Sequence, residues 1–548
     1  MSLVDMIHDL SSRFLTTFAH LSAESTNQFL PTPISDAILR PVGRRGSGCY
    51  LSMDIGGSNL RVGFVEVVGR HETGDGTAAD RIKRHLEESW SIDDRLKNDN
   101  ADSLFEWIGS CVARVVDRGC SVLDLARDRP LPLGVTFSFP MEQTSLAEAR
   151  LMSMGKGFAV SANLDLGSRL LAGYDVARRA RQSSTPTATA AARPLPPLRV
   201  AAIANDSVST LVSFIVRYDD ESGCESETAV SAAADVEEEE KKYHGRRGRL
   251  SRRRRRRACM GLILGTGCNA TIPLPMSRLH PSKRPPSVSV LPGSAVSSDV
   301  RVTVNTEWSI NGTAPPLRAM GLVSRWDREL DSANEAPGFQ PLEYMTAGRY
   351  LGELGRIMLV DYLTSVMGVD PAALPPGLLR RHSMTTTFLS HFRPLRRPAA
   401  HLLASLEAEF PAATAAAAAA VGPGLFAFAW TEDMAVALYH IAKAIEVRAA
   451  GIVAAATVAL LILGGELSPD ASDAPDVFDD LGVGYTGGCI VHFQDYLVDC
   501  QAFIDGLVAR RLGPDPAQRV VLSPCHDGGI TGAGILVAAA SESEDAHV

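Results

Sequence analysis

Residues 50–68 read YLSMDIGGSNLRVGFVEVV, two apolar runs separated by a short glycine turn. Residues 260–272 read MGLILGTGCNATI and repeat the same order of strand, glycine turn and strand. Apolar runs on either side of a Gly-rich turn predict a β-hairpin in each place. Because further strands alternate with helical stretches along the chain, the sequence predicts an α/β fold.

The rest of the chain supplies the other elements of such a fold. RVAAIANDSVSTLVSFIV (199–216) predicts a buried strand, a polar turn and a helix. A strand is expected over 132–139, and helices are expected over 1–18, 102–116, 434–460, 494–512 and 532–540. The uncharged stretch 449–465 has 17 residues, just short of the ~20 that span a bilayer. We expect it to be a buried helix running into a buried strand, not a membrane span.

Several biased segments predict insertions between these elements. Residues 219–257 run from VEEEE to SRRRRRR, and we expect them to be disordered because they hold too little apolar surface to order themselves. The arginine run 252–257 is either a solvated loop or a nuclear-import or nucleic-acid patch. The other expected linkers and loops are 183–199, 281–298 and 468–480, and 412–420 is an alanine run ended by VGPG.

Composition limits the class of protein. The chain has 548 residues, 45% of them hydrophobic and 21% charged, which excludes a wholly disordered or fibrous protein. Its net charge of −9 argues against a protein that coats nucleic acid. The nine cysteines are an odd number without CxxC spacing, so we expect free thiols in a reducing compartment. The N-terminal stretch carries acidic residues and lacks an apolar core of the signal-peptide type.

The two glycine turns and a few carboxylates are the candidates for chemistry. Small residues let backbone N–H groups approach an anion, and Asp54 beside the first turn could hold a hydrated Mg²⁺; ordinary hairpin turns are the alternative. Asp206 is either a helix cap or a general base at a strand end. Glu307 and Glu343 lie among apolar neighbours and need partners such as sugar hydroxyls, although each alone is more often a surface residue.

Six stretches together resemble the eukaryotic hexokinase family, of the fungal kind. LGVTFSFPMEQTSL (133–146) is similar to the family's sugar-binding signature, and the two glycine hairpins are similar to its two phosphate motifs. The other matching stretches are ANDSVSTLVS (204–213), VNTEWS (304–309) and PGFQPLEYMTAGRYLGELGRIML (337–359). The resemblance implies a two-lobed α/β fold of the hexokinase and actin-like ATPase type. It assigns 1–47 and 205–519 to a large domain, and 48–204 and 520–548 to a small domain that closes on the sugar.

The resemblance also assigns roles to single residues. Asp206 is the implied base that takes the proton of the sugar 6-hydroxyl, and Lys156 in MSMGKGF holds the sugar and supports charge. The other implied sugar ligands are Ser138, Asn205, Asn269, Glu307 and Glu343. The implied nucleotide positions are Asp54, Gly56, Gly57, Ser58, Asn59, Arg61, Gly265, Thr266, Gly267, Gly487, Gly488, Asp527 and Gly528. No residue is assigned as a direct metal ligand.

Departures from the family pattern cluster on the nucleotide side. The family's Glu-Asp-Gly-Ser-Gly is His-Asp-Gly-Gly-Ile here, with Gly529 replacing a serine and Ile530 replacing a glycine. Gly488 replaces another serine, and Gly155 replaces a threonine beside the lysine. Each lost hydrogen bond costs about 0.5–1.5 kcal/mol, so we expect weakened use of ATP. The alternative is a catalytically impaired sugar sensor that signals to a regulatory protein partner.

The resemblance further implies ATP with Mg²⁺ as cofactor. The implied substrate is a hexose: glucose, with fructose and mannose as alternatives. Neither a membrane span nor a nucleic-acid partner is expected. The expected location is cytoplasmic, with nuclear or mitochondrial-surface association as alternatives.

Overall fold

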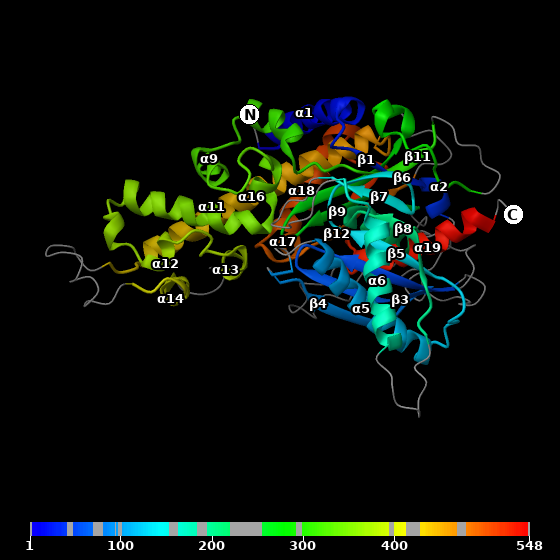
Figure 1. Cartoon of the computed structure of the whole chain (residues 1–548). Helices are drawn as coiled ribbons and strands as arrows, with labels where there is room; N and C mark the ends of the chain where they lie inside the picture. The colour runs from blue at the N-terminus through cyan, green and yellow to red at the C-terminus, as the bar shows by residue number, and fades with distance from the viewer. Residues whose placement is uncertain are drawn as a thin grey trace, which may run out of the picture.

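The computed structural model shows a two-lobed α/β protein (Figure 1). It describes residues 3–40, 48–68, 81–93, 95–96, 101–152, 163–183, 194–219, 255–291, 299–393, 399–412, 428–467 and 478–545. The fold class predicted from the sequence is confirmed. Two separate sheets form the centres of the two lobes, and both predicted glycine hairpins are present.

The first sheet has six strands in the order β1-β11-β10-β9-β12-β13. These strands are β1 (Leu30–Ser35), β9 (Arg256–Leu264), β10 (Cys268–Pro275), β11 (Arg301–Asn305), β12 (Asp480–Thr486) and β13 (Arg519–Pro524). The hairpin β9–β10 is antiparallel, whereas β12 runs parallel to both β9 and β13. The second glycine turn and the end of β12 therefore lie at the same edge of the sheet.

The second sheet has five strands in the order β4-β3-β2-β5-β8. Its strands are β2 (Gly48–Ile55), β3 (Asn59–Val67), β4 (Ile82–Ser91), β5 (Leu131–Phe137) and β8 (Leu198–Ala204). The hairpin β2–β3 is antiparallel, and β5 runs parallel to both β2 and β8. The ends of β2, β5 and β8 thus bring the first glycine turn, the sugar-binding signature and Asp206 to one edge. A separate hairpin joins β6 (Met141–Ser145) and β7 (Glu148–Leu151).

Two buried helices lie between the sheets. Helix α7 (Asp206–Tyr218) packs on β9 of the six-stranded sheet, and α19 (Gly528–Asp545) packs on β2, β3 and β5 of the other. The two helices also pack on each other, and their apolar side chains form one cluster with residues of both sheets. Helices α5 (Ala101–Val122) and α6 (Leu166–Ser183) pack together and contact strands of the five-stranded sheet.

The larger lobe is completed by three long helices and a group of short ones (Figure 1). Helix α16 (Glu432–Leu463) packs against α1 (Leu3–Glu24) and α18 (Tyr496–Leu512). The others are α2 (Asp36–Leu39), α8 (Ala314–Ala319), α9 (Arg325–Ser332), α10 (Pro341–Thr346), α11 (Gly348–Asp361), α12 (Pro376–Leu379), α13 (Thr386–His391), α14 (Ala399–Glu409) and α17 (Gly488–His492). All predicted helices that fall on described residues are present, most of them longer than expected.

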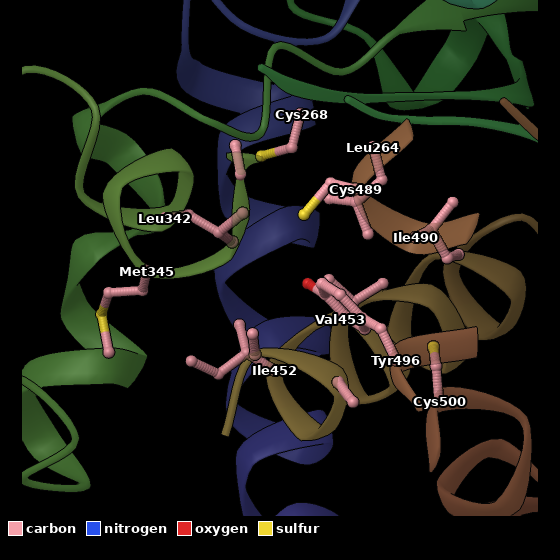
Figure 2. Packing of buried hydrophobic residues seen from close by; sticks show 14 of the residues in the cluster. Leu264, Cys268, Leu342, Met345, Ile452, Val453, Cys489, Ile490, Tyr496 and Cys500 are labelled. Atoms are coloured by element: carbon pink, nitrogen blue, oxygen red, sulfur yellow. The ribbon is translucent and has the colours of Figure 1, made fainter. Parts of the chain in front are cut away.

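The core behind the second glycine turn is tightly packed. Figure 2 shows Tyr496 among buried side chains that include Cys268, Cys489 and Leu342. The Tyr496 hydroxyl donates to the carbonyl of Thr346 at 3.1 Å, and the Cys268 sulfur accepts from the Thr346 hydroxyl at 3.4 Å. Because Cys268 is the first residue of β10, this packing gives the glycine turn a rigid support. The eight cysteines in the described part of the chain are free, as predicted.

The stretch 449–465 differs from the prediction in one respect. It continues α16 as helix to Leu463 and then turns, so the expected buried strand is absent. Its many alanines and leucines favour a continuous helix, and the neighbouring helices α1 and α18 bury it. Among the described helices, α16 alone is long and apolar enough to cross a membrane, but 83% of its most apolar stretch is buried inside the fold.

The prediction that residues 219–257 are disordered is wrong at both ends of the segment. Asp219 accepts a hydrogen bond from the Ala258 backbone at 2.5 Å and pairs with Arg40 at 2.7 Å. Arg257 pairs with Asp36 at 3.3 Å and with Glu466 at 3.1 Å. Strand β9 begins at Arg256, so the last arginines of the 252–257 run belong to the sheet and not to a solvated loop.

Other predicted segments fall partly outside the described residues. Residues 220–254, 413–427 and 468–477 are of this kind, as are 184–193 and 292–298. Of the linker 183–199, its last two residues begin β8. The division into domains stays a prediction, but the position of β13 differs from the predicted boundary at residue 520. This strand pairs with β12 in the six-stranded sheet, whereas the sequence grouped residues from 520 onward with the small domain.

Candidate active site

Asp206 is the first residue of α7, and only Asn205 separates it from the end of β8. The cap of this helix is Asn205, whose Oδ1 accepts from the backbone of Ser207 at 2.9 Å and from its hydroxyl at 2.7 Å. The Ser207 hydroxyl is also 2.6 Å from that of Thr271 on β10. The capping role that was an alternative for Asp206 is thus filled by Asn205. The Asp206 carboxylate is half-buried and accepts from the Ser207 backbone at 2.9 Å.

Three polar side chains meet where β10 begins and β11 ends. Asn269 donates through Nδ2 to Oδ1 of Asn305 at 2.8 Å and to Oε1 of Glu307 at 3.2 Å. Asn305 Nδ2 donates to the same Glu307 oxygen at 2.8 Å. Glu307 has a left-handed backbone with φ +46, and Gln28 donates to its carbonyl at 2.9 Å. Strain at a non-glycine residue persists only where its surroundings enforce it, which is typical of functional sites.

Asn305 and Gln28 are site residues that the sequence reasoning missed. Asn305 stands in the matched stretch VNTEWS, two positions before Glu307, so alternation along the strand could have revealed it. Gln28 has no such signal, because it comes from the loop before β1 and reaches Glu307 across 279 residues of sequence.

Glu343, on α10, lies against the second glycine turn. Its Oε2 accepts from the backbone N–H of Cys268 at 3.1 Å. A Cβ at Gly267 would lie 2.7 Å from the same oxygen, so a side chain there would require the Glu343 carboxylate to move. The turn is also held from α11, where Gly348 donates to the Gly265 carbonyl at 2.8 Å and Arg349 donates to that of Thr266 at 3.2 Å.

Gly487 and Gly488 lie beside this second turn. Gly487 has φ +122, and a Cβ there would lie 2.3 Å from the backbone of Leu264. A Cβ on Gly265 would lie 3.4 Å from the Cα of Gly487. Two glycine segments predicted to face the nucleotide are therefore neighbours, and they leave a surface without side chains. Such a surface fits a phosphate chain approached by backbone amides.

The first glycine turn sits at the edge of the other sheet. Gly56 donates to the carbonyl of Asn59 at 2.9 Å and closes the turn, while Ser58 accepts from Ile92 at 2.8 Å. Ser138 donates its backbone N–H to Ile55 at 3.1 Å. The sugar-binding signature thus lies directly beside the first phosphate motif; Gly57 completes the turn.

Arg61 connects the first phosphate motif to the C-terminal one. It binds Asp54 at 2.6 Å through one guanidinium nitrogen and Asp527 at 2.8 Å through another. Burial raises the pKa of Asp54, the pairing with Arg61 lowers it, and the negative charge of Asp206 raises it again, with a net upward shift. Asp54 and Asp206 therefore interact across the two motifs, and Gly528 follows Asp527 as the first residue of α19.

The substitutions at 529 and 530 have structural causes that the sequence does not show. A Cβ at Gly529 would lie 2.5 Å from Oδ2 of Asp54, so glycine leaves room for the pair between Asp54 and Arg61. Thr136 donates to the Gly529 carbonyl at 2.8 Å. Ile530 is only 1% exposed, so its side chain packs in the interior. That its bulk lies on the nucleotide side stays a prediction from the sequence.

Two parts of the predicted site need separate mention. Lys156 and Gly155 lie outside the described residues, so their placement stays a prediction. Among the described residues, no group of three or more His, Cys, Asp or Glu side chains could hold a metal ion. Asp54 with Asp206 nearby nevertheless fits an Mg²⁺ that keeps most of its waters and arrives with a nucleotide, since one or two carboxylates suffice for that.

A cavity of about 410 Å³ lies away from this site. It is lined by residues of α1 and α16, among them Ile7, Leu10 and Ile452. The predicted site is instead formed by the facing edges of the two sheets, where the hydrogen bonds above hold its polar groups. We therefore do not assign the cavity to the reaction.

Comparison with known proteins supports this assignment of motifs. Two family profiles, each described as hexokinase, match residues 3–216 and 259–539. Hexokinase-5 of Oryza sativa subsp. japonica is 26% identical over 512 residues, which cover 91% of this chain and 80% of the rice protein. Hexokinase-2 of Rattus norvegicus is 27% identical over 343 residues, 63% of this chain and 29% of the rat protein. The chain thus matches less than a third of the length of such animal relatives.

Solved structures show the same fold. The hexokinase from Schistosoma mansoni complexed with glucose matches with a TM-score of 0.67 at 21% identity, covering 98% of this chain and 96% of that one. A second hexokinase crystal structure matches with a TM-score of 0.65 at 20% identity and the same coverage. With two family profiles that match its two halves, the chain belongs to the hexokinase family.

Proposed function

We propose that this protein transfers the γ-phosphate of ATP, bound with Mg²⁺, to the 6-hydroxyl of a hexose. Glucose is the first candidate, with fructose and mannose as alternatives. One observation carries the proposal: Asp206 lies at the start of α7, where the next residue, Ser207, contacts Thr271 of the strand that carries Asn269, and the charge of Asp206 acts on Asp54 of the first phosphate motif. A base in this place lies between groups that suit hydroxyls and groups that suit phosphates.

Asp206 would accept the proton of the attacking hydroxyl. Phosphoryl transfer depends on positioning and on stabilising charge, and the protein forms no covalent intermediate in such a reaction. Asn205 supports this role by capping α7, which holds the neighbouring carboxylate at a fixed point. Bound Mg²⁺ would neutralise phosphate charge, and Asp54 is the carboxylate that suits its water shell. Closure of the two lobes would exclude water, which would otherwise accept the phosphate.

The polar cluster would select the sugar. Glu307 and Glu343 are both buried, and each already accepts hydrogen bonds from protein groups. A hydroxyl of the sugar could fill the remaining acceptor positions of such a carboxylate. An analogue that lacks the hydroxyl would leave these buried groups incompletely bonded, which discriminates strongly against it.

The nucleotide-side substitutions bear on the rate. Gly529 accommodates the Asp54 and Arg61 pair, and Ile530 packs in the interior, so neither change obstructs the glycine surface. We therefore favour an active enzyme, with an ATP requirement above that of relatives that keep the serines. A regulatory sugar sensor with a protein partner is the alternative, and membership of a fungal branch stays a prediction from the sequence. A cytoplasmic location is proposed on the free cysteines alone.

The experiment is a coupled assay with glucose, ATP and Mg²⁺ on the wild type and Asp206→Ala. A positioned base contributes ~10²–10⁴-fold, so the variant should lose that much turnover while keeping its thermal midpoint. Asp117→Asn, an exposed carboxylate on α5 paired with Arg181, is the matched control and should keep full activity. A wild type that binds glucose but shows no turnover would contradict the proposal and favour the sensor.

A further inference from the structure

Strand β4 contains a bulge opposite β3. Val62 of β3 lies opposite Glu88, whereas Phe64, two residues further on, lies opposite His85, three residues further back. One extra residue is therefore inserted in β4 between these two pairs. A bulge of this kind shifts the alternation of side chains beyond it to the other face of the sheet.

The surrounding backbone holds this bulge in place. Leu86 has φ +53, a left-handed conformation that is rare for a residue with a Cβ. The bulge presses on β3 at Gly63, where a Cβ would lie 3.0 Å from the Cα of Glu87. The bulge thus keeps Leu86 in an unfavourable conformation and places a glycine opposite it. Strain of this kind is typical of functional features.

The consequence of the bulge is the direction of Arg84. Without the bulge, the side chains of Arg84 and Glu88 would point to the same face of the sheet, since the two residues are four positions apart in one strand. Glu88 points toward α5, where it pairs with Arg114 at 2.9 Å. Arg84 lies opposite Val65 instead, on the face that α19 covers: a Cβ at Gly534 of that helix would lie 2.5 Å from Val65. The bulge thus turns Arg84 toward the start of α19.

There Arg84 shares the carboxylate of Asp527 with Arg61. Arg84 lies 3.1 Å from Oδ2 of Asp527, while Arg61 lies 2.8 Å from Oδ1. Arg84 also pairs with Glu87 at 3.0 Å, and Arg61 also pairs with Asp54 at 2.6 Å. Each oxygen of Asp527 has its own cation, so this carboxylate does not draw Arg61 away from Asp54.

We propose that Arg84 is a positioning residue for the phosphate end of the nucleotide. It would act through Asp527, whose carbonyl accepts from the Thr531 backbone at 3.2 Å at the start of α19, and so hold the first backbone N–H groups of that helix in place. Such groups at a long helix are suited to phosphate oxygens. None of the matched sequence motifs includes Arg84. The inference rests on the proposed function, because it takes ATP with Mg²⁺ as the ligand.

The expected effect is confined to the nucleotide. Arg84→Gln removes a charge-assisted contact that is half exposed, so the Kd and KM for MgATP should rise about three- to tenfold. The KM for hexose and the kcat at saturating MgATP should stay unchanged. Arg84→Lys should recover part of the affinity, because an ammonium keeps the positive charge but lacks the planar, pre-organised fork of donors that a guanidinium presents.

The test measures MgATP binding by calorimetry together with steady-state kinetics. Arg118→Gln is the control, since it removes an arginine that pairs with Glu88 on the opposite face of β4. Weaker MgATP binding for Arg84→Gln, partial recovery for Arg84→Lys and an unchanged Arg118→Gln are expected. Should Arg84→Gln fail to fold, the comparison of Arg84→Lys with Arg118→Gln decides. Arg84→Lys should then lose some MgATP affinity, although less than expected for Arg84→Gln, and Arg118→Gln should lose none.

Two kinds of failure remain distinct. A wild type that binds MgATP without phosphorylating any hexose would refute the proposed function, while the binding series would still decide the role of Arg84. A wild type that does not bind MgATP overturns the inference. Equal MgATP affinities for Arg84→Gln and Arg118→Gln overturn it as well, and so does an equal rise in the KM for hexose.

Discussion

Replacing Gly529 by serine should destabilise this protein, although it restores the residue usual in the family. The new Cβ would lie 2.5 Å from Oδ2 and 2.7 Å from Cγ of Asp54, closer than real Cβ contacts. Asp54 is buried and held by Arg61 at 2.6 Å, and Thr136 fixes the 529 carbonyl from the other side. Since the backbone is held, relief of the clash requires the Asp54 carboxylate to turn away from Arg61.

The cost follows from two terms. Overpacking a close-packed site costs about 1–3 kcal/mol. Losing a hydrogen bond to a charged group costs about 1.5–3 kcal/mol, although partial adjustment will avoid some of it. We expect a net loss of about 2–4 kcal/mol and, for a chain of this length, a thermal midpoint lower by roughly 2–4 °C. The same movement of Asp54 should weaken MgATP binding, the opposite of the recovery that sequence comparison alone would suggest.

The assay is thermal unfolding of Gly529→Ser and Gly529→Ala beside a control glycine. Gly506→Ala lies within α18 with its nearest neighbour at 3.8 Å, so it should be neutral or stabilising by up to about 1 kcal/mol. In an Asp54→Ala background, Gly529→Ser should cost much less, because the clashing carboxylate is gone. A Gly529→Ser protein as stable as the wild type, or an equal cost in both backgrounds, would refute the reasoning.

Two further predictions concern the buried carboxylate of Glu446 and the segment 219–257. Burial raises the pKa of Glu446 to about 7, although the nearby Lys443 lowers it. Because the folded protein holds this proton more tightly than the unfolded chain, the stability that protonated Glu446 contributes is present below about pH 4.5 and is lost as the pH rises through 7. Glu446→Gln should flatten this decline in urea unfolding midpoints measured from pH 5 to 8; an unchanged slope would contradict it. Deleting 220–254 should leave the thermal midpoint within a few degrees, since long insertions add little closure entropy. Deleting 219–257 should lower it markedly by breaking buried pairs, and equal midpoints for the two deletions would show that Asp219 and Arg257 are not structural.

Much of the candidate site could be predicted from the chain because its motifs are local. The turns around Gly57 and Gly267 follow from glycine between apolar strands, and the structure contains both hairpins. Asn205 and Asp206 follow a buried strand, which places them at a sheet edge. Local patterns of this sort depend on backbone sterics and strand periodicity, which residues close in sequence determine.

Other features could not be predicted, because they depend on contacts between distant segments. Gln28 donates to Glu307 from a segment far away in the sequence. In the sequence, Arg257 is one of six arginines in a charged run, and only the fold pairs it with Asp36 and Glu466. The stretch 449–465 predicted a strand at its end, yet packing of α1 and α18 keeps it helical to Leu463.

The amino-acid sequence by itself determined the α/β class, the two glycine hairpins and the candidate base, because strand periodicity and the steric freedom of glycine act over a few residues. Tertiary structure alone decided that Arg61 joins Asp54 to Asp527, and that a bulge turns Arg84 to the same carboxylate. It also decided that Gly529 leaves space for Asp54. Except for the Asp54–Arg61 pair, which lies within the β2–β3 hairpin, these contacts join residues hundreds of positions apart. Their energies arise from burial and charge, which exist only once the two sheets and α19 have packed together.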